Sequence, residues 1–108
     1  MPTPDFDHTK LDDVVHSRLR LGVMAYLSTA ATASFVDLRT KVNASDGNLS
    51  KQLSKLEEAG YVRIEKGFNG KKPQTLIHLT PRGREAWIAY LDQLEAFIAA
   101  SRQTGGAS

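Results

Sequence analysis

From residue 11 to about 28, hydrophobic positions recur every three or four residues. This spacing is that of one face of an α-helix, and it predicts a first helix whose stripe is formed by Leu11, Val14, Val15, Leu19, Val23 and Leu27. The small residues at 29–34 break the pattern. A short second helix is then predicted, with Ser34 as its N-cap and an apolar face of Phe35, Leu38 and Val42.

A third helix is predicted over residues 45–59, after the turn sequence N-A-S-D-G-N. Ser45 suits its N-cap, because a serine hydroxyl accepts a hydrogen bond from a backbone N–H of the first turn. Asp46 suits the positive end of the helix dipole. Three leucines follow at i, i+4 and i+7, and this spacing predicts a buried seam of Leu49, Leu53 and Leu56.

The period then changes to two. Apolar and polar residues alternate over 61–65 and again over 74–79, as they do along a half-buried strand. Two glycines and a proline between them predict a loop. Together they predict a two-stranded hairpin over 61–79 with a long, basic tip.

A long last helix is predicted over residues 81–102. Thr80 as N-cap followed by Pro81 at the first helical position is a strong start signal. Its apolar residues exceed what so small a core needs, although some should also fill the monomer core. With the start of the first helix, they predict a homodimer surface of Leu11, Val14, Trp87, Tyr90, Leu91, Leu94, Phe97 and Ile98.

This order of elements predicts an α+β fold, the winged helix-turn-helix. It consists of three N-terminal helices, a two-stranded β-hairpin wing and a long C-terminal dimerisation helix. The 108 residues fit one domain, expected over 11–102 between flexible tails at 1–10 and 103–108.

Composition narrows the function. The chain has no cysteine, which excludes a disulfide framework, a thiol redox switch and a thiolate metal site. The sequence contains neither a long apolar run nor a basic, apolar start, so we expect no membrane partner and a cytoplasmic location. No nucleophile–base–acid set or glycine-rich phosphate loop is recognisable, so we expect neither catalysis nor a cofactor.

Charge is unevenly distributed, although the net charge is only +2. Residues 18–84 carry twelve Lys and Arg against five Asp and Glu, whereas both ends of the chain are acidic. A basic centre between acidic ends favours a polyanionic partner, and an ordinary solvated surface is the alternative.

Several segments resemble the stand-alone winged-helix transcriptional regulators, short relatives of the MarR and ArsR families. They are S-F-V-D-L-R, D-G-N-L-S-K-Q-L-S-K-L-E-E-A-G-Y-V, K-G-F-N-G-K-K-P-Q-T and L-T-P-R-G-R-E-A-W-I-A-Y-L, and the resemblance covers residues 19–94. It implies a dimer that contacts DNA through the helix at 45–59 and through the wing. Many ArsR-like members carry His where Gln52 stands here, so their base preference does not transfer to this position.

The polar face of the third helix is the predicted reader of base edges. Asn and Gln pair with adenine through a donor and an acceptor, while Lys reaches guanine or phosphate. The candidates on this helix are Ser45, Asn48, Ser50, Lys51, Gln52 and Lys55. In the wing, phosphate contacts are expected from Lys66, Asn69, Lys71, Lys72 and Gln74.

Two other functions remain open from the sequence. Winged helices also serve as protein-interaction modules, but the polar and basic face of the third helix argues against that role. A small-ligand or metal sensor is compatible with DNA binding. His8, Asp12 and His16 would share one face of a continuous helix, but two aspartates also favour a plain helix start, and we predict no metal site.

Overall fold

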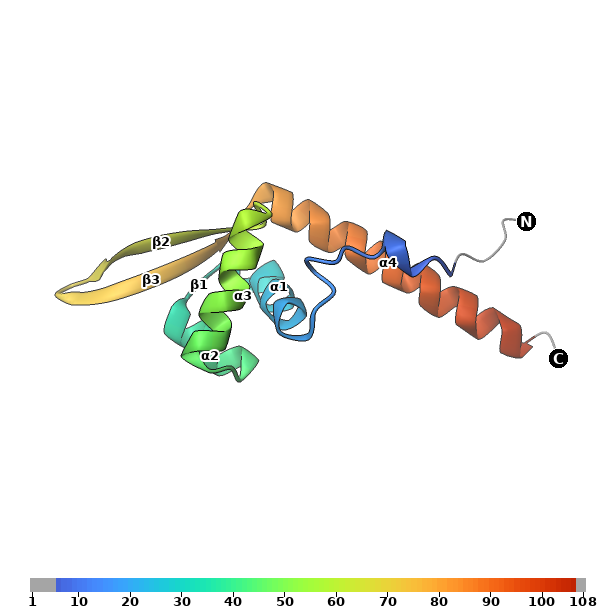
Figure 1. Cartoon of the computed structure of the whole chain (residues 1–108), viewed down its shortest axis with the longest axis horizontal. Coiled ribbons are helices and arrows are strands. Elements are labelled where there is room, and N and C mark those ends of the chain that lie inside the picture. Colours follow the sequence, from blue (N-terminus) through green and yellow to red (C-terminus); the bar gives the residue numbers. More distant parts are fainter. Residues whose placement is uncertain (1–5, 107–108) are drawn as a thin grey trace.

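The computed structural model describes residues 6–106 as a winged helix (Figure 1). A 3₁₀ turn, η1 (His8–Lys10), precedes the helices α1 (Arg18–Ala30), α2 (Phe35–Val42) and α3 (Asp46–Glu58). Strands β1 (Thr32–Ser34), β2 (Val62–Asn69) and β3 (Lys72–Leu79) form an antiparallel sheet in the order β1-β3-β2. The last helix, α4 (Pro81–Gly106), runs away from the body of the fold on the side opposite the wing.

Short polar side chains start three of the helices, as predicted. The Ser34 hydroxyl accepts a hydrogen bond from the Asp37 N–H at 3.1 Å, and the Ser45 hydroxyl accepts one from the Asn48 N–H at 3.2 Å. Thr80 does the same for the Gly83 N–H at 2.9 Å. These caps satisfy N–H groups that have no partner inside their helices.

The core forms where α1, α2 and α3 meet the inner face of the sheet. The seam of Leu49, Leu53 and Leu56 is buried, which confirms the prediction for α3. Around it pack other fully buried side chains, among them Met24, Leu27, Leu38 and Ile77. Burial of this apolar surface is the main stabilising contribution, and it leaves the opposite face of α3 to solvent.

The first helix begins seven residues later than predicted, because residues 11–17 form an irregular strap. The Asp12 carboxylate accepts hydrogen bonds from the N–H groups of Val14 and Val15, at 2.8 and 3.3 Å, and so forms a turn in place of helix. Ser17 is extended, with φ −146° and ψ 136°. The prediction of a continuous helix was therefore wrong, and no such helix aligns His8, Asp12 and His16. The described part of the chain holds no group of three or more His, Cys, Asp or Glu suited to a metal ion.

The sheet has one strand more than predicted. Residues 32–34 were expected in an irregular break, but they pair with β3, with Ala33 opposite Ile77. Three residues are too short to show an alternating pattern, so this pairing is dictated by the tertiary fold. The basic tip is also tighter than the predicted long loop: β2 pairs with β3 as far as Asn69 and Lys72, which leaves Gly70 and Lys71 to make the turn. Gly70 has φ +66°, which glycine adopts without strain.

Helix α4 is also longer than predicted, since it continues to Gly106. Part of the predicted 103–108 tail is thus helical, and residues 107–108 lie outside the described part. At the other end, His8–Lys10 of the predicted 1–10 tail form η1, and residues 1–5 lie outside that part. Within residues 6–106, none of the helices is long and apolar enough to cross a membrane.

The start of α4 is held tightly against the corner between α3 and β2. The Thr80 N–H donates to the Tyr61 carbonyl at 3.1 Å, and the Thr80 hydroxyl donates to the Gly60 carbonyl at 2.6 Å. Gly83 packs onto the same corner so closely that a Cβ atom there would lie 2.1 Å from the Tyr61 carbonyl oxygen. Only glycine permits this approach.

The three tyrosines make the stability of the fold depend on pH, because the fold raises the pKa of each. Burial, followed by a hydrogen bond to Asp12, raises the pKa of Tyr61 to about 12. A hydrogen bond to Asp37 raises the pKa of Tyr26, and burial raises that of Tyr90. Unfolded tyrosine titrates near pH 10, so the unfolded chain releases these protons first.

The free energy of unfolding is therefore expected to fall as pH rises from about 10 to 12. Tyrosinate absorbance of the native protein should lag behind that of the urea-unfolded chain over this range. Tyr61→Phe should remove the part of the native signal that appears last. Coincident native and unfolded titration curves would contradict these pKa directions.

Candidate DNA-binding surface

The solvent face of α3 carries most of the predicted base-contacting residues. Because the leucine seam faces inward, Asn48, Ser50, Lys51 and Lys55 are exposed. Ser45 lies at the helix start, where its hydroxyl is engaged as the N-cap. Asp46, beside it, pairs with Arg39 at 2.6 Å, so this arginine of α2 is held against the start of α3.

Gln52 differs from its neighbours, because it is half-buried and faces α1. Its Oε1 atom accepts a hydrogen bond from Nη1 of Arg20 at 2.5 Å. Its Nε2 atom donates to Oδ1 of Asn48, one turn earlier, at 3.2 Å. No local sequence pattern links Arg20 to Gln52, since 32 positions separate them, so this role of Arg20 could not be predicted.

The wing residues divide between two faces of the hairpin. Lys66 lies opposite Thr75, and it shares a face with Ile64 and Ile77, which pack on the core. Asn69 and Lys72 pair with each other and belong to the other face, as does Gln74, while Lys71 occupies the turn. All of these except Gln74, which is half-buried, are exposed.

One groove joins the wing to α3. The groove is lined from α3 by Ser50, Leu53, Ser54 and Glu57, from α2 by Phe35, and from the strands by Ile64, Lys66 and Thr75. Strand alternation also places Phe68 on this face, beyond Lys66, and its side chain is 74% exposed. One side of α3 and one face of the wing therefore border a common groove.

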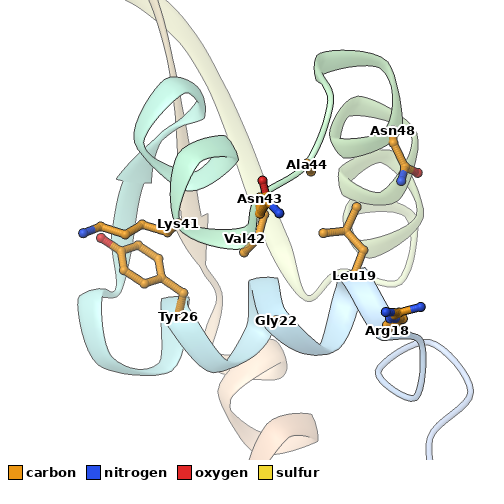
Figure 2. A pocket seen from close by; sticks show the side chains of 9 residues that line it. All are labelled: Arg18, Leu19, Gly22, Tyr26, Lys41, Val42, Asn43, Ala44 and Asn48. Carbon is orange, nitrogen blue, oxygen red and sulfur yellow. The ribbon is translucent and has the colours of Figure 1, made fainter.

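A second hollow, of about 540 Å³, lies between α1 and the turn that joins α2 to α3 (Figure 2). Leu19 and Val42 contribute its apolar part. Lys41 and Tyr26 lie at one end, whereas Arg18 and Asn48 lie at the other. Of the two cations that border this hollow, Arg18 therefore lies on the side of α3, whereas Lys41 lies at the far end.

Part of the predicted dimer surface is buried inside the monomer. Leu11 and Tyr90 are buried, and the Tyr90 hydroxyl hydrogen-bonds Nδ1 of His16 at 2.6 Å while its ring stacks on Trp87. These two residues therefore belong to the core rather than to an exposed surface. Four more are half-buried: Val14, Trp87, Leu94 and Phe97.

What remains is an exposed apolar stripe on α4. Leu91 and Ile98 are 37% and 42% exposed. Ile88, which was not among the predicted interface residues, is the most exposed of the three at 52%. At 100° per residue these side chains project from one side of the helix. The sequence pattern identified the apolar residues of α4 but did not distinguish those that pack on the core from those that are exposed.

Comparisons with known proteins agree with this architecture. A family model described as a winged helix DNA-binding domain matches residues 19–98. An uncharacterised protein of Methanocaldococcus jannaschii is 33% identical over 81 residues, which cover 75% of this chain and 88% of that protein.

Two solved structures share the fold. A transcriptional regulator homologue from Pyrococcus horikoshii OT3 superposes with a TM-score of 0.76 at 28% identity, covering 80% of this chain and 85% of the other. A protein of Enterococcus faecalis V583, assigned to the MarR family of transcriptional regulators, gives 0.70 at 21% identity, with 88% and 84% coverage. Since the matched residues include α3, both wing strands and most of α4, this chain belongs to the family of winged helix DNA-binding domains.

Proposed function

We propose that this protein binds specific sites on double-stranded DNA as a homodimer and represses transcription by occupying promoters. Membership of a DNA-binding family and the regulator-like fold support the general role. The observation that carries the proposal is the shared groove of α3 and the wing, lined by Ser50, Ser54 and Lys66. A helix and a ribbon that border one groove can reach a single duplex together.

In this arrangement α3 enters the major groove and the wing follows the backbone. Exposed Lys51 and Lys55 lie within reach of base edges or phosphates, and Asn48 lies in the first turn of α3, the end of a recognition helix that usually contacts bases. The lysines of the wing neutralise phosphates, which repeat along every sequence. Affinity would thus come mainly from the lysines and base preference from α3.

The dimer is proposed to form along the apolar stripe of α4. A specific interface of standard size buries about 1,600 Å² in total, which is about 800 Å² from each partner. A helix that extends beyond the body, with Ile88, Leu91 and Ile98 exposed, supplies an apolar centre for such an interface. Two copies of α3 about 34 Å apart would meet successive major grooves, and the preferred site would be a pseudo-palindrome.

Binding to a labelled random duplex at two salt concentrations tests the function directly. A DNA-binding protein should lose affinity steeply as salt rises, because bound lysines release counterions. A protein-interaction module on the same fold should show no saturable binding. Selection of bound sites from a random library then reports both base preference and site symmetry.

Lys66→Ala is expected to weaken binding by a similar factor on every sequence and to flatten the salt slope by about one unit, as loss of one phosphate contact does. Fluorescence anisotropy over a salt series measures both effects. Lys10→Ala, at an exposed position of η1 on the side of the fold opposite the wing, removes the same charge and should leave the slope unchanged. An unchanged slope for Lys66→Ala would remove Lys66 from the interface.

A further inference from the structure

The amide groups on α3 are held in a defined orientation by a chain of hydrogen bonds. Arginine carries only donors, so the atom of Gln52 that meets Arg20 Nη1 is the amide oxygen. The Gln52 nitrogen then points along the helix and donates to Oδ1 of Asn48. The oxygens of both amides are therefore engaged within the protein.

Arg20 is itself fixed by the strap at residues 11–17. Its Nε atom donates to the Val14 carbonyl at 2.6 Å, and its Nη2 atom approaches the Asp13 carbonyl at 3.4 Å. The Asp12 carboxylate, which shapes this strap, also accepts a hydrogen bond from the Tyr61 hydroxyl. The orientation of Gln52 is thus set by contacts far from the exposed face of α3.

The orientation of these two amides changes which base edge α3 can recognise. Asn or Gln recognises adenine by presenting its oxygen and its nitrogen side by side to the N6 and N7 atoms. Here the Asn48 oxygen already accepts from Gln52, so an adenine contact would leave it only its second lone pair, whereas a guanine contact uses hydrogens that have no partner. The free groups are N–H donors: both hydrogens of Asn48 Nδ2 and the second hydrogen of Gln52 Nε2.

We propose that the Asn48–Gln52 pair donates to an acceptor-only purine edge, the O6 and N7 atoms of guanine, and that Arg20 is the residue that imposes this preference. The inference rests on the proposed function, since it requires α3 to lie in a major groove. It replaces the adenine contact expected from residue types alone. Arg20 acts as a positioning residue, because its Nε, Nη1 and Nη2 atoms each donate a hydrogen bond within the protein.

The test begins with sites selected by the wild-type protein from a random duplex library. One base pair of each half-site should be a guanine whose replacement by adenine lowers affinity on the order of tenfold or more, the discrimination of one good bidentate contact. Arg20→Ala frees the Gln52 amide, so this ratio should fall toward one while preferences at the other positions persist.

Controls separate positioning from charge and from folding. Arg63→Ala removes the same charge from an exposed residue of β2, on the hairpin face that points away from the core, and it should leave the guanine-to-adenine ratio intact. Gln52→Met keeps the volume of the side chain, removes its hydrogen bonds, and should abolish the ratio as Arg20→Ala does. The double variant should show no further loss, because both changes break one chain of contacts.

The outcomes distinguish the inference from the function on which it rests. If the wild-type protein binds no duplex in a salt-dependent manner, the proposed function fails. If it selects symmetric sites but prefers adenine at this position, or if Arg20→Ala leaves the ratio unchanged, DNA binding stands and the role of Arg20 is overturned.

Discussion

Replacing Gly83 by alanine is expected to destabilise the fold by about 3 kcal/mol or more, the upper range for forcing extra atoms into a packed site. The new methyl carbon would lie 2.1 Å from the Tyr61 carbonyl oxygen, and backbone atoms cannot rotate out of the way as a flexible side chain can. Relief requires α4 to move away from the corner, which breaks the hydrogen bonds that Thr80 makes to Gly60 and Tyr61. A domain of this size is stable by only about 5–15 kcal/mol, so much of that stability would be lost.

Urea unfolding followed by the fluorescence of Trp87, the only tryptophan, measures this effect. Gly47→Ala is the matched control, because Gly47 lies in α3 with nothing within 4 Å of its added methyl group. Alanine is the better helix former there, so the control should be neutral or stabilising by up to about 1 kcal/mol. Equal stabilities for Gly83→Ala and the wild type would show that α4 does not pack on Tyr61 as described.

Leu91→Glu is expected to convert the proposed dimer into a monomer and to lower affinity for a symmetric site by at least about a hundredfold. A carboxylate in the centre of an apolar interface loses its hydration without gaining a partner, at a cost of several kcal/mol. Loss of the dimer also removes the advantage of two linked half-sites, since the second contact is no longer intramolecular. Sedimentation equilibrium and anisotropy on whole sites and half-sites measure the two effects.

Ala96→Glu adds the same charge on the opposite side of α4, about 140° around the helix from Leu91, and should remain dimeric. Binding of a half-site should be similar for Leu91→Glu and the wild type, because α3 and the wing are untouched. A wild-type protein that sediments as a monomer at micromolar concentration, or a Leu91→Glu variant that stays dimeric, would exclude the α4 stripe as the interface.

Local patterns were sufficient for most of the fold. The leucine seam of α3 and the caps at Ser34, Ser45 and Thr80 depend on residues within a few positions of one another, and the structure contains all of them. The strap at residues 11–17 was missed because its apolar residues also have helical spacing. What breaks the helix there is Asp12, which binds two backbone N–H groups and the distant Tyr61 hydroxyl.

The candidate site was predictable from the sequence to a similar extent. Once the seam was placed inward, helical geometry alone required Asn48, Lys51 and Lys55 to be exposed, and they are. The orientation of the Gln52 amide was not predictable, because it depends on Arg20, 32 positions away. Residue types thus indicated which side chains belong to the surface, while a long-range contact decides which of their atoms face outward. Their contacts with DNA remain predictions.

The anchored start of α4 has a mechanical consequence. Thr80 and Gly83 attach α4 to the corner where α3 ends and the wing begins. The helix α3, the wing and the start of α4 therefore form one packed unit. With 26 residues, α4 is about 39 Å long. In a dimer built on α4, a change of a few degrees in the angle at which the two α4 helices cross would displace the two α3 helices by several ångströms. The proposed dimer would therefore couple the crossing angle of its α4 helices to the spacing of its two α3 helices.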